Sequence, residues 1–151
     1  MSKRTLILIT LLIVVPVSIY FLMPGDKARI RKMIRKGAAA VEQENLDETM
    51  KAVSLSYRDE HGMTYLLLKK GFERFFRMFD DIEVDIEKVD VTVDDDAASS
   101  EIYVRVIATR GTERSYIVGD AADPLKIVFS LEKEKIRWQI TSARGMPGYY
   151  Y

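Results

Sequence analysis

The stretch YRDEHGMTY, residues 57–65, contains the only histidine of the chain, set among acidic and phenolic side chains. Histidine is the side-chain type best suited to acid–base chemistry near neutral pH, and Asp59 could orient the imidazole of His61 for such a role. No serine or second histidine is placed by the sequence to complete a relay. The competing interpretation is a tight turn in which Gly62 adopts a conformation that other residues resist and Asp59 accepts bonds from local amides. We favour the turn and predict no catalytic residue.

An isomerase-like mechanism would instead need a buried carboxylate beside hydrogen-bond donors such as tyrosines. Tyr57, Tyr103 and Asp85 carry suitable groups. Asp85, however, alternates with apolar residues on a predicted strand and is therefore expected to point outward. Arg105 shares its strand face with Tyr103, so both would line a pocket together with Trp138 if that face turned inward. If the face turned outward, Arg105 would be a surface charge.

Metal and cofactor sites are not predicted. The chain has no cysteine and one histidine, which are too few dependable ligands for zinc. The acidic run at residues 94–96 lacks the spacing and central glycine of an EF-hand loop, which favours a solvated hairpin tip over weak calcium binding. Motifs for phosphate cradles, nucleophile elbows and dinucleotide binding are missing. Acidic and basic residues number 23 each, so overall charge gives no reason to expect nucleic acid as a partner.

Residues 5–23, TLILITLLIVVPVSIYFLM, form an uncharged apolar run. At about 1.5 Å per residue, its length matches the ~30 Å hydrocarbon core of a bilayer. Bulky residues at its end differ from the small residues of a signal-peptide cleavage site, so we expect an uncleaved signal anchor. Lys3 and Arg4 favour a cytoplasmic N-terminus, while the basic residues between Lys27 and Lys36 compete with them.

Three helices are predicted before any sheet. The first begins with Asp26 as its N-cap and has a basic face opposite an apolar one. Asn45 is predicted to cap a second, short helix, with Glu48 returning the hydrogen bond. The third runs from about Thr64 to Phe79 and carries an apolar stripe wide enough to bury against a large surface. That stripe consists of Tyr65, Leu68, Phe72, Phe75, Phe76 and Phe79.

From Ile82 onward the apolar period changes from 3.6 to 2. Alternation over residues 82–86 resumes in the opposite parity over residues 89–93, which predicts a bulge near Glu87-Lys88 and a strongly curved strand. Further strands are predicted at residues 102–108, 115–118, 127–131 and 136–140, the last with Ile136, Trp138 and Ile140 on one face. The fold class is α+β, with the aromatic helix in the concave side of an antiparallel sheet of four to six strands. Such a cone tends to enclose a pocket.

The order of elements, the segment SLSYRDEHG and the final WQI strand resemble the NTF2-like (SnoaL-like, cystatin-fold cone) superfamily. The likeness covers about residues 26–142 and is nearest to small bacterial extracytoplasmic members. Its motif Ser-x-x-Tyr-x-Asp-x-x-Gly is matched by Ser54, Tyr57, Asp59 and Gly62, with Trp138 and Ile140 in the final strand. Many such relatives are lipoproteins, whereas this chain has no cysteine to lipidate and would be tethered by its apolar helix. The superfamily includes isomerases, dehydratases and accessory domains, so the resemblance implies a fold and not an activity.

The predicted organisation is a short cytoplasmic N-terminus at residues 1–4, a transmembrane anchor at 5–23, an NTF2-like domain at 26–143 and a tyrosine-rich tail at 144–151. The resemblance places this single-pass protein in the bacterial inner (cytoplasmic) membrane, with the domain on the periplasmic side. The alternative keeps the domain in the cytoplasm, where its basic first helix would rest on anionic lipid.

The expected function is non-catalytic binding or scaffolding, and the alternative is an isomerase- or dehydratase-like enzyme that uses the cone. The expected ligand-binding residues are Tyr57, Asp59, Tyr103, Arg105 and Trp138. Expected partners are the bilayer through residues 5–23, a small apolar ligand, and either a second copy of the chain or another membrane protein. The tail residues Tyr149 to Tyr151 suit such a contact because tyrosine is apolar along its ring and polar at its hydroxyl.

Overall fold

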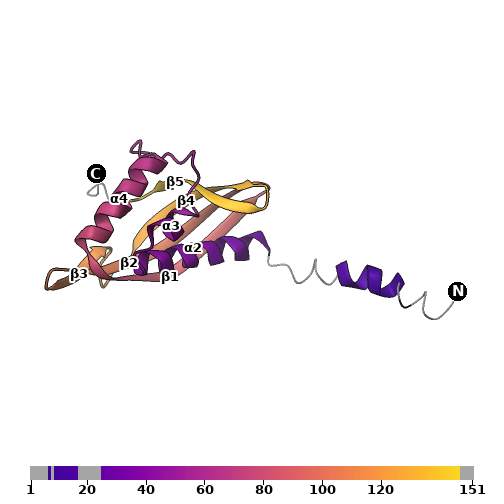
Figure 1. Cartoon of the computed structure of the whole chain (residues 1–151), viewed down its shortest axis with the longest axis horizontal. Helices are drawn as coiled ribbons and strands as arrows, with labels where there is room; N and C mark the ends of the chain where they lie inside the picture. Colours follow the sequence, from indigo (N-terminus) through magenta and orange to yellow (C-terminus); the bar gives the residue numbers. More distant parts are fainter. Residues whose placement is uncertain (1–6, 8, 17–24, 147–151) are drawn as a thin grey trace.

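The computed structural model describes residues 7, 9–16 and 25–146 (Figure 1). Residues 9–16 are helical and expose apolar side chains, among them Leu11, Leu12 and Ile13. Much of the predicted anchor at 5–23 and the end of the predicted tail, residues 147–151, lie outside the described residues. Among the helices that the structure describes, none is both long and apolar enough to span a bilayer. The anchor therefore stays a prediction.

Within residues 25–146, three helices precede the sheet, as predicted. They are α2 (Asp26–Glu42), α3 (Leu46–Met50) and α4 (Tyr65–Met78). The short helix α3 is capped by Asn45, whose side-chain oxygen accepts a 3.1 Å bond from the Glu48 backbone N–H. The predicted return bond is wrong, because the Glu48 carboxylate pairs with Lys51 and Lys36 instead.

The predicted N-cap of α2 is also wrong. Gly25 occupies the cap position, and Asp26 makes no capping bond. Its carboxylate accepts a 3.1 Å bond from Trp138 Nε1 and a 2.9 Å bond from Lys133 Nζ. Two donors from a hairpin more than 100 residues further along the chain therefore replace the local amides, and they connect the start of α2 to the end of the sheet. The sequence around Asp26 contains no sign of these partners.

The sheet has five antiparallel strands (Figure 1). They are β1 (Asp80–Asp94), β2 (Ala97–Arg110), β3 (Glu113–Val118), β4 (Leu125–Glu134) and β5 (Arg137–Arg144). The order is β1-β2-β4-β5, and β3 pairs with β2. One edge of β2 is taken by β1, whereas its other edge is shared between β4 along residues 97–104 and β3 along residues 106–110. The long strand β2 is therefore the central strand, which pairs with three of the other four.

The predicted bulge in β1 is present. The pairing with β2 shifts register between Ile86 and Lys88, so Glu87 is the extra residue. Both Ile82 and Val91, which have opposite parity in the sequence, are consequently buried. The run at residues 94–96 forms the β1–β2 hairpin tip, as predicted, with Asp95 at a φ of 50°.

The placement of Ile136 in the final strand is wrong. Its side chain is 76% exposed in the turn between β4 and β5, whereas Trp138 is buried. The preceding Lys135 has a φ of 58°, so the chain reverses here. A residue within such a turn does not follow the alternation of the strand that comes next.

The core lies between the concave face of the sheet and the helices α2 and α3. From the helical side it contains Ile30, Ile34 and Met50, and from the sheet side Ile102, Val104, Ile127 and Leu131, all buried. Helix α4 covers the rest of the concave face, as predicted, but none of its residues is fully buried. Leu68 and Phe72 are partly buried against the core and lie beside a cavity.

Replacement of Asp26 tests the tie between α2 and the hairpin. The hydrogen bond from Trp138, with Lys133 beside it, holds the pKa of Asp26 below its usual value. A carboxylate with a lowered folded pKa contributes stability above its unfolded pKa, and this contribution is lost as pH falls through the folded pKa. We expect Asp26→Asn to cost about 1–2 kcal/mol of unfolding free energy at about pH 7 and less at about pH 3.

Urea titrations at the two pH values measure this difference. The exposed Asp94, at the end of β1, provides the control variant Asp94→Asn, for which we expect little change at either pH. An equal cost of Asp26→Asn at both pH values would contradict the proposed role of the charge.

Candidate functional site

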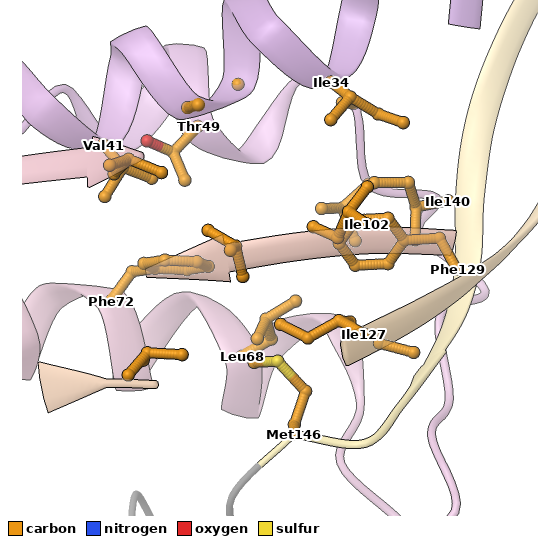
Figure 2. Close-up of a pocket in the computed structure, with 18 of the residues that line it drawn as sticks. Ile34, Val41, Thr49, Leu68, Phe72, Ile102, Ile127, Phe129, Ile140 and Met146 are labelled. Carbon is orange, nitrogen blue, oxygen red and sulfur yellow. The ribbon is translucent and has the colours of Figure 1, made fainter. Parts of the chain in front are cut away.

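A cavity of about 270 Å³ lies between the concave face of the sheet and the helices. Figure 2 shows Leu68 and Phe72 reaching from α4 into the space that Ile102 and Ile127 approach from the sheet. Ile34 and Val41 enter it from α2, on the opposite side from α4 (Figure 2). Within the described part of the chain, the polar side chains of the lining are Thr49, Tyr57 and Asp59. The cavity is therefore suited to apolar groups.

Two helical glycines help to keep this space open. Gly37 of α2 and Gly71 of α4 both line the cavity, and a Cβ at either position would meet no other atom within 4 Å. Glycine inside a helix is destabilising by roughly 0.5–1 kcal/mol relative to alanine. Both glycines therefore weaken their helices, and both lie where a larger side chain would have open space beside the cavity.

The turn predicted for residues 59–62 is confirmed. Oδ1 of Asp59 accepts 2.9 Å bonds from the backbone N–H groups of His61 and Met63, and Gly62 has a φ of 79°. Asp59 is nonetheless 8% exposed and lines the cavity, as does the buried Tyr57. His61 lies on the surface, where its Nε2 is 3.7 Å from Glu60 Oε1. The carboxylate of Asp59 thus holds the backbone of the turn that leads into α4.

Tyr103 and Arg105 lie on the outer face of the sheet, away from the cavity. Their strand neighbours Ile102, Val104 and Val106 line the cavity, so alternation turns Tyr103 and Arg105 outward. The ring of Tyr103 lies 5.9 Å from Lys88 Nζ.

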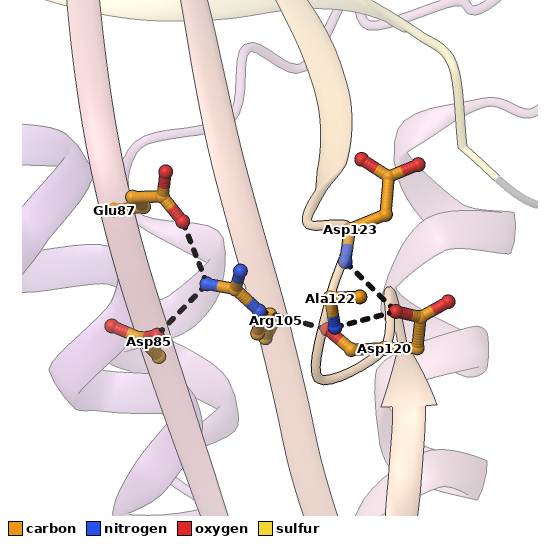
Figure 3. Close-up of polar contacts among 6 residues, drawn as sticks. All are labelled: Asp85, Glu87, Arg105, Asp120, Ala122 and Asp123. Carbon is orange, nitrogen blue, oxygen red and sulfur yellow. Dashed lines mark hydrogen bonds and ion pairs between the residues drawn. The ribbon is translucent and has the colours of Figure 1, made fainter.

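The guanidinium of Arg105 joins three segments of the chain (Figure 3). Its Nη1 donates to Glu87 at 2.8 Å and to Asp85 at 3.3 Å, while its Nε donates to the Asp120 carbonyl at 2.8 Å. The pKa of Arg105 is raised chiefly by its bond to Glu87. Asp120 in turn accepts 2.8 Å bonds from the amides of Asp123 and Ala122, which lower the pKa of its carboxyl. Arg105 therefore connects the β1 bulge to the loop between β3 and β4.

Trp138 is buried beneath the start of α2, where its indole binds Asp26, and it does not line the cavity. Of the five predicted ligand-binding residues, the fold thus brings Tyr57 and Asp59 to the cavity and places Tyr103, Arg105 and Trp138 elsewhere. Ligand binding by any of them stays a prediction. The described residues contain no group of three potential metal ligands close enough to hold an ion.

The apolar lining of the cavity was not identified as a site in the sequence. Leu68, Phe72 and Phe75 were predicted as a buried stripe, and the inward residues of β1 and β2 as a buried face. These periodic patterns are the available signal, but they do not separate a cavity wall from a filled core, because both require apolar side chains.

No protein-family model matches the chain, and no curated protein matches it in sequence. Solved structures do match it. A putative aromatic ring hydroxylase from Novosphingobium aromaticivorans is 16% identical, with a TM-score of 0.66 over 78% of this chain and 85% of that chain. An NTF2-like superfamily protein from Salmonella enterica serovar Typhimurium is 12% identical, with a TM-score of 0.66 over 82% and 92%.

A putative scytalone dehydratase from Novosphingobium aromaticivorans is 14% identical, with a TM-score of 0.63 over 76% of this chain and 78% of that chain. A protein of unknown function from Nostoc punctiforme, described as having a cystatin-like fold, is 15% identical, with a TM-score of 0.62 over 78% and 87%. Identities this low carry information about the fold and not about activity. With three helices on a curved antiparallel sheet and a cavity between them, the chain has the NTF2-like, cystatin-like fold.

Proposed function

We propose that this protein is a membrane-tethered binding module that holds a small apolar ligand in the cavity between α4 and the sheet. The observation that carries the proposal is the cavity itself, with its almost wholly apolar lining. Protein interiors are close-packed, and voids larger than a water molecule are few. A space of about 270 Å³ far exceeds such a void and lies near the lower end of the range for ligand pockets.

The lining limits the chemistry of the ligand. A ligand with several polar groups would lose hydrogen bonds to water on entry, and each group left without a partner would cost on the order of 1–3 kcal/mol. The polar side chains Thr49, Tyr57 and Asp59 give few replacements. One oxygen of Asp59 already accepts two backbone bonds. The occupant is therefore a compact, mostly hydrocarbon molecule.

Two features support the tether: the exposed apolar side chains of residues 9–16 and the exposed basic side chains of helix α2. Four basic side chains of α2 are exposed and form no ion pair within the described residues. They are Lys27, Arg31, Lys32 and Arg35. Basic residues that closely follow an apolar segment are attracted to anionic headgroups. We place the domain on the periplasmic side of a bacterial cytoplasmic membrane, as the resemblance to small extracytoplasmic NTF2-like proteins implies. Lys3 and Arg4 favour this orientation, whereas the basic residues between Lys27 and Lys36 oppose it.

A second candidate function is catalysis inside the same cavity. The observation in its favour is Asp59, a carboxylate on the cavity wall together with Tyr57. Two structural neighbours are named as a putative hydroxylase and a putative dehydratase. Against this candidate, Asp85, the other carboxylate considered, lies on the outer face and pairs with Arg105. Asp59 itself is engaged by the turn that it stabilises.

Filling the cavity tests the binding function. Gly71→Leu adds a side chain at a cavity-lining position with open space, and we expect the helix to tolerate it because leucine favours helices more than glycine does. We expect the affinity for the neutral apolar dye N-phenyl-1-naphthylamine to fall by about tenfold, which corresponds to ~1.4 kcal/mol. Fluorescence titration of the full chain in nanodiscs measures this, with protein-free nanodiscs as the background.

The matched control is Leu66→Phe, which adds volume on the exposed side of the same helix. We expect this variant to bind the dye as the wild type does. Equal loss in both variants, or dye binding that is unchanged in Gly71→Leu, would contradict binding inside the cavity.

The role of Asp59 is tested by a pair of substitutions. Asparagine keeps a side-chain oxygen that can accept from both amides, whereas alanine keeps none. We expect Asp59→Ala to lower the unfolding free energy by about 1–3 kcal/mol and Asp59→Asn to cost less than half as much. Urea titration of both variants distinguishes these outcomes. Equal destabilisation by the two substitutions would mean that the negative charge, and not the acceptor geometry, is what the turn requires.

The tether and its orientation are tested in whole cells. We expect the full chain to stay with membranes through an alkaline carbonate wash and Ile13→Arg to weaken that retention, because arginine in the hydrocarbon core costs about 2.5–3.5 kcal/mol. Leu66→Arg, on the exposed face of α4, serves as the control. A phosphatase that is active only in the periplasm, fused after Tyr151, should be active. Release of the wild type by the wash, or an inactive fusion, would contradict the tether or the orientation respectively.

A further inference from the structure

A second cleft, of about 240 Å³, adjoins the outer side of α4. Its walls are the turn at residues 61–63 and the side of α4 that carries Leu67, Lys70, Gly71 and Arg74. Leu67, Lys70 and Arg74 are exposed, so this cleft lies at the surface. Met63 and Gly71 line both this cleft and the apolar cavity. The two spaces therefore have these two residues as a common wall.

The wall shared by the cavity and the cleft contains few side-chain atoms. Gly71 has no side chain, and a Cβ there would meet no other atom within 4 Å. The side chain of Met63 is unbranched and can change rotamer at low cost. At Gly71, therefore, no side chain stands between the two spaces.

The cleft is basic. Lys70 and Arg74 stand one turn apart on α4, and neither forms an ion pair within residues 25–146. No acidic side chain lines the cleft among the described residues. The nearby Glu60 lies 3.7 Å from His61 and accepts a bond from the Gly145 amide. The cleft therefore presents two cations beside an exposed leucine, next to a cavity that contains no cation.

We propose that the ligand is an anionic single-chain amphiphile, with its hydrocarbon chain in the cavity and its carboxylate or phosphate at Lys70 and Arg74. This inference rests on the proposed binding function and names the class of ligand. A charged headgroup inside the cavity would be desolvated beside the carboxylate of Asp59, which is unfavourable. At the cleft, the same headgroup keeps contact with water and gains charge-assisted bonds, and arginine can bind it with two parallel N–H groups.

The contributions of the hydrocarbon chain and of the headgroup to affinity are distinguished by comparing decanoate with decanol. These molecules have the same chain length and differ in the headgroup. Each displaces N-phenyl-1-naphthylamine from the full chain in nanodiscs, and the lipid background is common to all variants. The double variant Lys70→Gln/Arg74→Gln removes both cations of the cleft. We expect it to weaken decanoate binding by about five- to tenfold, as two exposed charge contacts would, and to leave decanol binding within about twofold.

Arg77→Gln is the matched control, because Arg77 is an exposed cation on the same helix that lines neither space. We expect it to leave both affinities unchanged. Equal weakening of decanoate and decanol by the double variant, no weakening of decanoate, or the same selective loss in Arg77→Gln would overturn the headgroup site while leaving the apolar cavity as a binding site. Failure of the dye, decanoate and decanol all to bind would overturn the proposed function and this inference with it.

Discussion

The bulge at Glu87 is the constraint on which the rest of the structure depends. Strand β1 pairs with β2 over nearly its whole length, and one extra residue lets both halves of β1 turn apolar side chains to the same concave face. Without it, residues 89–93 would present their valines to water. On the outer face, Arg105 binds Asp85 and Glu87 together and also holds the loop after β3. The partly buried Arg105 therefore joins the bulged part of β1 to the loop between β3 and β4.

Curvature creates the space that the helices then divide. Helix α2 fills one part of the concavity with Ile30 and Ile34, and its start is held to the β4–β5 hairpin by the carboxylate of Asp26. Helix α4 lies across another part without filling it. A stripe of aromatic side chains and a glycine at position 71 leave an apolar cavity between this helix and the sheet. The cavity is thus a product of how far apart packed elements stand, and not of any single residue.

The two spaces beside α4 differ in polarity and in charge. The inner surface of the cavity consists almost only of apolar groups, whereas the adjoining cleft, which shares Gly71 with it, presents Lys70 and Arg74. An amphiphile satisfies both environments, because neither its chain nor its headgroup has to be placed in an unfavourable medium. Asp59 contributes by shaping the turn that forms one wall of each space, with its oxygen on two backbone amides. The membrane tether that we propose would keep such a module beside a source of amphiphiles.

The sequence by itself determined the three helices α2, α3 and α4, the change of period at Ile82, the bulge near Glu87 and the turn at Asp59. These features depend on neighbours within a few residues, where hydrophobic period and turn chemistry act directly. The resemblance to the NTF2-like fold followed from the order of those elements. Only the tertiary structure decided that Tyr103 and Arg105 face outward, that Ile136 belongs to a turn, and that Asp26 binds Trp138. It also decided that the apolar stripe of α4 borders a cavity and that Gly71 lines both this cavity and a basic cleft. Such outcomes depend on the distances between elements far apart in the chain, which hydrophobic periodicity does not encode.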